Sequence, residues 1–288
     1  MMNPARPRPQ LPYGVNWESE QAQGLIGWWP LTPAFGIRAY DLVKKAMAPQ
    51  GSTGLSVSNL VSNPTLGRMN AFSSNNKYYD IGTAYQVSLP ITITSWVILT
   101  STAGRAFLGT AMSPVNHAGA LISAKRISGT SGGFEATYGA NTSATSSGRR
   151  SKEGATNLAT NTLYFLSASI RGATDMSVYV NGVDDGGSYS GSGGAMVNTG
   201  NGWIGHAGSA ASVGAAQLGD CRIYAGNKTA AQHFRMFDPK TRWDLYWQPG
   251  KKVISLPGSS TVGARIWQLA SLGASPTVDG AIWELASI

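Results

Sequence analysis

The sequence predicts an all-β protein built from short antiparallel strands, on three observations. Short apolar runs alternate with stretches rich in Gly, Ser and Thr, and 36 of the 288 residues are glycine. Charged residues make up only 12% of the chain, whereas exposed helix faces need many charges to stay soluble. The strand-like runs also follow one another too closely for crossover helices, which argues against a parallel α/β sheet.

Nine segments are expected to form strands. Each is a short apolar run bounded by turn residues, the pattern of a strand with at least one buried face. The expected strands are 24–31, 78–81, 91–99, 105–109, 163–170, 176–180, a return strand from Val183, 203–205 and 218–224.

Two of these segments support more detailed predictions. Residues 91–99 alternate apolar side chains with Thr or Ser, which places the apolar ones toward a core and the hydroxyls toward water. Asn181-Gly182 is the preferred pair for a two-residue type I′ turn, so a hairpin is expected there.

Residues 140–160 are small and polar, which predicts a long surface excursion.

One short helix is expected near the end of the folded region, over residues 229–237. Thr229 has the side chain of an N-cap, and Asp238-Pro239 stops the helix. The aromatic stretch that follows, residues 242–249, is expected to pack back on the strands.

The chain divides into an arm, a domain and a tail. Four prolines make residues 1–22 an extended arm, residues 23–250 form the domain, and residues 251–288 form a Gly/Ser-rich tail. The tail repeats Ile-Trp-x-Leu-Ala-Ser at 266–271 and 282–287, a pattern typical of short strands. The arm has no apolar stretch after its basic residues, so no secretory signal is expected, and no apolar run is long enough to span a membrane.

The formal charge of +8 does not point to a nucleic-acid site. Basic residues occur as scattered pairs and no nucleic-acid-binding motif accompanies them, so no nucleic-acid partner is expected. The single cysteine, Cys221, excludes an internal disulfide, and its place in a strand-like run predicts a small buried side chain.

Four segments in order resemble the LamG-like branch of the concanavalin A-like lectin/glucanase superfamily. They are 24–31 with Ala39-Tyr40-Asp41-Leu42, 91–97, 179–183 and 218–224. The resemblance covers residues 23–249 and implies an antiparallel jelly-roll β-sandwich. It implies no particular activity, because this fold hosts hydrolases, lectins, calcium-dependent adhesion modules and structural domains.

The residues offer no catalytic constellation, so the chain is expected not to be an enzyme. A glucanase of this superfamily carries Glu-x-Asp-x-x-Glu on one strand, which places carboxylates on one face beside a glycosidic bond. None of the five glutamates has such a partner; they are Glu18, Glu20, Glu135, Glu153 and Glu284. No phosphate-binding loop and no Ser or Cys nucleophile with partners is found.

Metal sites have equally little support. Two positions that are commonly Asp in the resembling family are Ser73 and Lys77 here, which argues against the family's calcium site. Asp184-Asp185 is interpreted as a solvated turn, with cation binding as the alternative. The three histidines are too far apart for zinc; they are His117, His206 and His233. No cofactor is therefore expected, with calcium as the remaining alternative.

The tryptophans fall into two groups. Trp28, Trp29, Trp96 and Trp203 lie in expected strands and are interpreted as core. The tail has little core of its own, so its two tryptophans are expected to bind a pocket of a partner. With two arginines of the arm they form the expected assembly contacts: Arg6, Arg8, Trp267 and Trp283.

These observations lead to two hypotheses. The first is a non-enzymatic virion structural protein, a capsid decoration or fibre-associated module that its terminal segments attach to other virion proteins or to further copies of itself. Such a protein is made in the host cytoplasm, which agrees with the missing signal, and LamG-like domains recur among phage structural proteins. The alternative is a carbohydrate-binding or adhesion module that recognises a glycan on a cell surface.

Overall fold

The computed structural model describes residue 9 and residues 14–31, 38–49, 59–72, 77–101, 105–112, 116–125, 132–205 and 215–247. All of them belong to one compact unit, residues 1–247. The tail and the first eight residues lie outside the described ranges.

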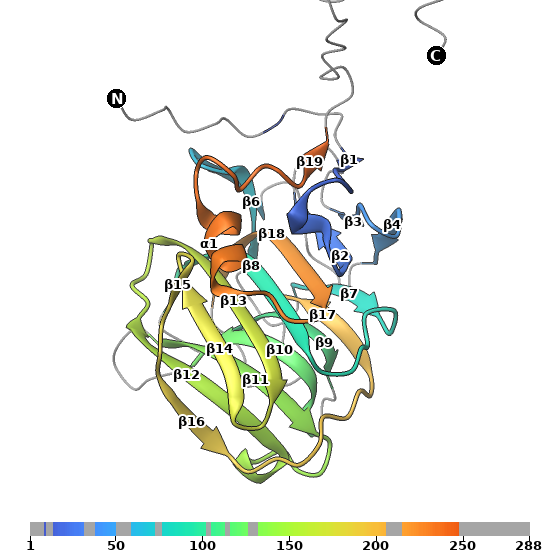
Figure 1. Ribbon diagram of the computed structural model, residues 1–288, viewed down its shortest axis with the longest axis vertical. Helices are drawn as coiled ribbons and strands as arrows, with labels where there is room; N and C mark the ends of the chain where they lie inside the picture. The colour runs from blue at the N-terminus through green and yellow to red at the C-terminus, as the bar shows by residue number, and fades with distance from the viewer. Residues whose placement is uncertain are drawn as a thin grey trace, which may run out of the picture. The chain divides into compact units, whose positions relative to one another are not determined.

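An eight-stranded sheet forms one layer (Figure 1). Its strands are β2 (Leu25–Trp29), β5 (Leu60–Asn63), β6 (Gly67–Phe72), β8 (Ile91–Leu99), β13 (Leu163–Gly172), β14 (Asp175–Val180), β15 (Val183–Asp184) and β18 (Ala216–Ala225). The order is β15-β14-β13-β8-β18-β6-β5, with β2 paired to β18 as well, and every pairing is antiparallel.

A seven-stranded sheet forms the other layer. Its strands are β7 (Tyr79–Gly82), β9 (Arg105–Met112), β10 (Ala118–Ala124), β11 (Gly133–Ala140), β12 (Arg149–Asn157), β16 (Ser188–Gly191) and β17 (Asn201–Ile204). The antiparallel order is β16-β12-β11-β10-β9-β17-β7. Smaller elements complete the described fold: β1 (Gly14–Val15) with β19 (Tyr246–Trp247), β3 (Ala39–Asp41) with β4 (Ala46–Ala48), η1 (Glu20–Ala22), η4 (Ser146–Gly148) and α1 (Ala230–Phe237).

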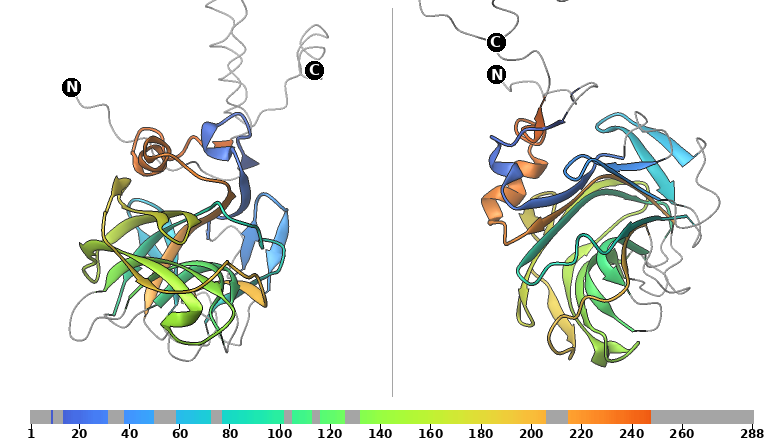
Figure 2. Two further views of the ribbon diagram at one scale, coloured as in Figure 1. Left: turned by 60° about the horizontal axis from the view of Figure 1, so that its bottom comes forward. Right: turned by 90° about the vertical axis from the view of Figure 1, so that its right-hand side faces the viewer.

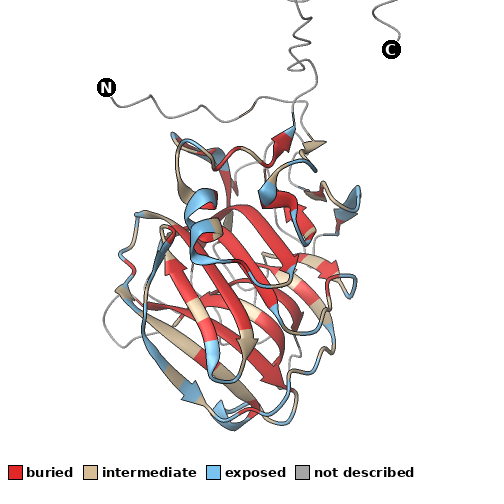
Figure 3. Ribbon diagram, viewed as in Figure 1, coloured by how far each residue is buried: buried red, intermediate tan, exposed pale blue. Residues whose placement is uncertain are grey.

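The two sheets stack face to face and enclose the main hydrophobic core (Figure 2). Strands of both layers supply it, among them β8 with Ile91, Ile93 and Val97 and β11 with Phe134 and Ala136, all completely buried. The predicted all-β sandwich is confirmed, and so are the nine expected strands, each of which overlaps an observed strand. Figure 3 shows burial continuing along the central strands of both sheets.

The outer face of the eight-stranded sheet is also covered, which the alternation along β8 did not predict. Thr92 and Thr94 on this face were expected to face water, but both are completely buried. The Ser95 hydroxyl is buried too, but on the inner face, 3.3 Å from Cys221 Sγ of the main core. A second apolar cluster lies on the outer face, in which α1 and residues 243–246 pack over the sheet. The Thr92 hydroxyl is satisfied inside the protein, 2.8 Å from the Ser169 hydroxyl and 2.9 Å from the Gly226 carbonyl oxygen.

The expected surface excursion at 140–160 is wrong for its second half, which forms β12. This strand has almost no apolar side chains, so hydrophobic periodicity could not reveal it. Long basic side chains hold it in place instead: Lys152 Nζ donates to the Met176 carbonyl oxygen at 2.9 Å, and Arg150 Nε donates to that of Ala173 at 2.7 Å.

The local turn and cap predictions are confirmed. Asn181 and Gly182 have φ values of 53° and 77°, the positive values that a type I′ turn requires, and Val180 pairs with Val183 across it. Thr229 caps α1 through a capping box with Gln232, and the helix ends at Phe237 before Asp238. Cys221 is completely buried, as expected.

A buried ion pair holds the N-terminal elements to β18. Arg222 and Asp220 have side chains at most 1% exposed and form two hydrogen bonds, 3.0 Å from Nε and 2.6 Å from Nη2. Arg222 Nη1 also donates to Gln21 Oε1 of η1 at 2.9 Å, and Trp28 Nε1 of β2 donates to Asp220 Oδ1 at 2.5 Å. Burial alone lowers the pKa of Arg222, but the charge of Asp220, its hydrogen bonds to the guanidinium and the nearby Tyr224 and Tyr246 together raise that pKa overall.

We expect Asp220→Asn to lower the free energy of unfolding by about 3 kcal/mol, because it leaves the buried guanidinium without a counter-charge. Asp220 has φ 51°, a conformation that Asn tolerates, so the variant tests the charge and not the backbone. Urea unfolding of both proteins measures the difference. The matched control is Asp175→Asn, whose partner Arg171 is at the surface and whose loss is expected to change stability little. A similar small change for Asp220→Asn would contradict the prediction.

His233 of α1 makes stability depend on pH. It is completely buried between the hydroxyls of Ser167 and Ser169, at 2.8 and 2.9 Å, and stacks on Tyr179 with ring centroids 3.9 Å apart. Burial, with the nearby positive charges of Lys228 and Arg171, lowers the pKa of His233 to about 3.

The unfolded chain therefore binds a proton at His233 between about pH 6.5 and pH 3 while the folded protein does not, so folding stability falls as the pH falls through this window. We expect the free energy of unfolding to drop by about 2 kcal/mol more between pH 6 and pH 4 in the natural protein than in His233→Gln, at about 1.4 kcal/mol for each pH unit. Equal pH slopes for the two proteins, measured by urea unfolding, would refute this role of His233.

Candidate functional site

A hollow of about 510 Å³ opens at one end of the sandwich. Three connections surround it: the β7–β8 loop, the turn between β13 and β14, and the glycine-rich loop between β16 and β17. The lining residues are Ser88, Leu89, Tyr138, Gly172, Ala173, Gly193, Gly194, Ala195, Met196 and Asn198. Its volume falls within the range of small-molecule sites in proteins. We call it the end cavity.

Two polar groups that line the end cavity form fewer hydrogen bonds to described residues than they can. Tyr138 is 2% exposed, and its hydroxyl makes no hydrogen bond to any described residue. Asn198 donates from Nδ2 to the Val87 carbonyl oxygen at 3.1 Å, while its buried Oδ1 accepts no hydrogen bond within the described part of the chain. Buried polar atoms are normally paired, so Asn198 Oδ1 marks a place where a ligand can supply the missing partner, and the Tyr138 hydroxyl lines the same hollow.

The glycine loop is held close to β12. Gly191 has φ 78°, and a Cβ at Gly193 would lie 2.6 Å from the Arg149 carbonyl carbon, so only glycine allows this close approach. Arg150 donates hydrogen bonds to the carbonyl oxygens of Ala173 and Gly191. These bonds connect the β13–β14 turn to the glycine loop, two walls of the end cavity. Burial raises the pKa of Tyr138, against an opposing effect of Arg150, so the phenol stays neutral at physiological pH.

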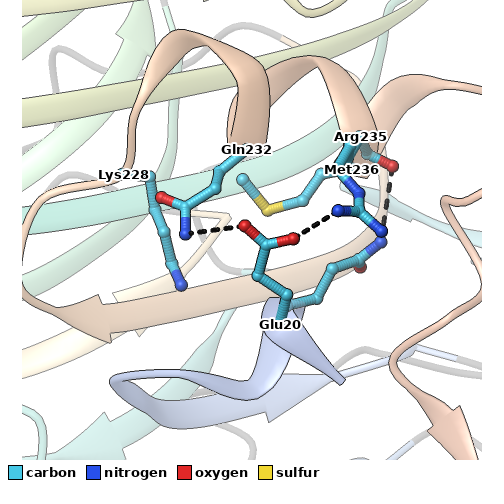
Figure 4. A pocket seen from close by; sticks show the side chains of 6 residues that line it. Glu20, Lys228, Gln232, Arg235 and Met236 are labelled. Carbon is cyan, nitrogen blue, oxygen red and sulfur yellow. Dashed lines mark hydrogen bonds and ion pairs between the residues drawn. The ribbon is translucent and has the colours of Figure 1, made fainter.

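A second hollow, between η1 and α1, is too small for a sugar. It encloses about 10 Å³, room for about one water molecule (Figure 4). Glu20 crosses its mouth, paired with Arg235 and accepting a 3.4 Å hydrogen bond from Gln232 Nε2, and Lys228 Nζ donates to the Gln23 carbonyl oxygen at 2.6 Å. These contacts attach η1 to α1, so we interpret the hollow as part of the packing.

Two glutamates that seemed isolated along the sequence are neighbours in space. Glu135 of β11 and Glu153 of β12 are directly opposite in the register. Glu153 forms an ion pair with Lys125 at 2.5 Å, whereas Glu135 Oε2 accepts a long hydrogen bond, 3.4 Å, from the Ser123 hydroxyl. Glu135 is 7% exposed, so a polysaccharide cannot lie between the two carboxylates in this arrangement, and neither residue lines the end cavity.

The structure tests only some of the residues singled out from the sequence. Arg6, Arg8, Trp267 and Trp283 lie outside the described residues, so their role as assembly contacts stays a prediction.

The tryptophans interpreted as core are largely confirmed. Trp28 and Trp29 are completely buried and Trp96 is 3% exposed. Trp203 is only partly buried, because it lies on the outer face of the seven-stranded sheet beside Tyr78, with ring centroids 5.4 Å apart.

Nothing in the described residues forms a metal centre. No group of three or more His, Cys, Asp or Glu side chains comes together there. His117 lies 3.3 Å from Arg149 Nη1, His233 is buried under α1, and His206 lies outside the described residues. In the Asp184-Asp185 turn both carboxylates accept hydrogen bonds, Asp184 from the Gly186 amide and Asp185 from Thr156. None of the helices that the structure describes has the length and apolar character needed to cross a membrane.

Sequence reasoning missed Tyr138 and Asn198. They are 60 residues apart, and no motif links them. The one available signal was the density of glycines at 186–194, which indicates close backbone approach but does not identify what is approached.

Neither a protein-family model nor a curated protein sequence matches the chain. Solved structures do match its fold. Trypanosoma rangeli sialidase is 16% identical over 74% of this chain and 32% of that chain, with a TM-score of 0.50. Domain 4 of AbnA, an extracellular GH43 arabinanase of Geobacillus stearothermophilus solved with arabinotriose, is 15% identical over 74% of this chain and 98% of that domain, with a TM-score of 0.52.

The receptor-binding domain of botulinum neurotoxin type G is 13% identical over 75% of this chain and 51% of that chain, with a TM-score of 0.51. The chain spans about a third of the sialidase and about half of the toxin domain, but nearly all of the AbnA domain. At these identities the comparisons show a shared β-sandwich fold.

Proposed function

We propose that this β-sandwich is a carbohydrate-binding module and that the end cavity is its binding site. The observation that carries the proposal is a hollow of about 510 Å³ whose lining includes the buried, unpaired Asn198 Oδ1 and the Tyr138 hydroxyl. Sugar hydroxyls both donate and accept hydrogen bonds, so a glycan can supply partners for both groups. Leu89 and Met196 add apolar surface for the C–H face of a sugar ring.

The solved structures of the same fold support this proposal. The AbnA domain is matched over 98% of its length, and it was solved with a bound arabinose trisaccharide. The LamG-like motifs identified in the sequence agree, since the superfamily that they resemble includes lectins. Binding without turnover is proposed because no described residue in the lining of the end cavity is a carboxylate, whereas hydrolysis of a glycosidic bond uses two.

Tyr138→Phe tests the site directly. The variant keeps the buried ring and removes the hydroxyl, so we expect the protein to fold normally and to bind its glycan about three- to tenfold more weakly, the effect of one lost hydrogen bond. A glycan array identifies the ligand, and titration calorimetry then compares the variants.

The matched control is Tyr179→Phe, which removes a hydroxyl from another buried tyrosine, the one that stacks on His233 under α1. This control is expected to bind like the natural protein. Equal affinities for all three proteins would place the glycan elsewhere, and an array with no bound glycan would refute the proposed function.

A second candidate, the virion structural protein, is favoured by where the terminal segments leave the domain. Gly14 and Trp247 are paired in register between β1 and β19, so the first and last strands of the described sandwich lie side by side. Figure 1 shows this pair at the opposite end from the β13–β14 turn that borders the end cavity. A module attached by both segments to a capsid or fibre would present the cavity outward, which makes the two candidates compatible.

Deleting residues 257–288 tests this second candidate. We expect the truncated protein to keep its fold, because the described sandwich ends before the deletion, and to be absent from purified particles. Circular dichroism checks folding and mass spectrometry of particles checks incorporation. A truncated protein that enters particles normally would contradict the anchoring role of the tail.

A further inference from the structure

None of the described residues that line the end cavity carries a formal charge. These ten residues are glycines, small or apolar residues, and the polar Ser88, Tyr138 and Asn198. Among them only Tyr138 has a titratable side chain, and burial raises its pKa and so favours the neutral form. A ligand bound here would therefore contact polar but uncharged groups. No described lining residue would compensate a charge on the ligand.

Arg150, a basic residue described beside the cavity, is already engaged. It donates from Nε to the Ala173 carbonyl oxygen at 2.7 Å and from Nη1 to that of Gly191, and its guanidinium lies 5.0 Å from the centre of the Tyr189 ring. These contacts direct the Arg150 guanidinium toward backbone carbonyl oxygens, and Arg150 does not line the cavity. A carboxylate in the cavity would thus lack the paired guanidinium that usually recognises one.

The orientation of the Asn198 amide is a second feature that discriminates between neutral and acidic ligands. Its Nδ2 must face the Val87 carbonyl oxygen, since only the NH2 group can donate there, so Oδ1 is the atom left buried without a described partner. Oδ1 accepts from a sugar hydroxyl but repels a carboxylate, which only accepts. The chain's formal charge of +8 attracts anions in general, so selection against them must come from this local arrangement.

We propose that the end cavity selects a glycan whose terminal sugar is uncharged and discriminates against glycans that end in an acidic sugar such as a sialic or uronic acid. This inference rests on the proposed function and deepens it by naming the ligand class.

The test uses the full-length chain and glycans printed as matched pairs that differ only in a terminal acidic sugar, lactose and 3′-sialyllactose being one pair. We expect binding to neutral members and binding at least about tenfold weaker to their acidic partners. Equal or stronger binding to the acidic members overturns the inference while leaving the proposed function intact. Binding to no glycan overturns both.

Ala195→Arg tests the location of the selection. Ala195 is an exposed residue of the cavity lining, and an arginine there supplies the guanidinium that the natural site lacks. We expect affinity for the acidic member of a bound pair to rise about tenfold relative to the neutral member, the contribution of a charge-assisted hydrogen bond.

The control is Ala159→Arg, the same substitution at an exposed position in the connection between β12 and β13, at the opposite end of β13 from the cavity. It adds the same overall charge and is expected to leave the ratio within each pair unchanged. If Ala195→Arg also leaves that ratio unchanged, or if Ala159→Arg shifts it equally, the selection does not reside in the end cavity and the inference falls.

Discussion

The buried contact between Arg222 and Asp220 is the constraint on which the arrangement of this sandwich depends. A guanidinium with no exposed surface is tolerated only when its donors and its charge are satisfied, and here three elements contribute to that: β18 supplies both ions, η1 supplies Gln21 and β2 supplies Trp28. These contacts therefore fix the positions of β18, η1 and β2 relative to one another. The strand β2 is fixed against β18, and the segment before it is fixed over the outer face of the eight-stranded sheet, where it joins α1 in covering the second apolar cluster.

This covering decides where a ligand can enter. The inner faces of the two sheets are occupied by the main core, and the outer face of the eight-stranded sheet is occupied by α1 and residues 243–246. In the seven-stranded sheet, Glu135 is 7% exposed and its neighbour Glu153 is paired with Lys125. What is left is the rim, where connections between strands form walls that the core does not fill. The end cavity lies there, and it contains Tyr138, a core residue whose polar end reaches the rim.

The proposed binding role and the proposed attachment role use opposite ends of the same body. The cavity is bordered by the β13–β14 turn, whereas the strands that begin and end the described sandwich, β1 and β19, pair at the other end (Figure 1). A rigid double sheet between them keeps a bound sugar away from any surface to which the terminal segments attach. The proposed glycan would bind in a hollow whose described lining residues are uncharged.

The sequence by itself determined the features that depend on neighbouring residues. The strand at residues 91–99, the Asn181-Gly182 turn and the Thr229 cap each follow from preferences within a few residues, and all three are present in the structure. Tertiary structure alone decided the rest. The burial of Thr92 depends on a helix more than 130 residues later, and β12 is held by basic side chains bonded to distant carbonyl groups. Tyr138 and Asn198 line one cavity only because a glycine loop folds against β12, and a shared cavity of residues 60 positions apart leaves no periodic trace in a sequence.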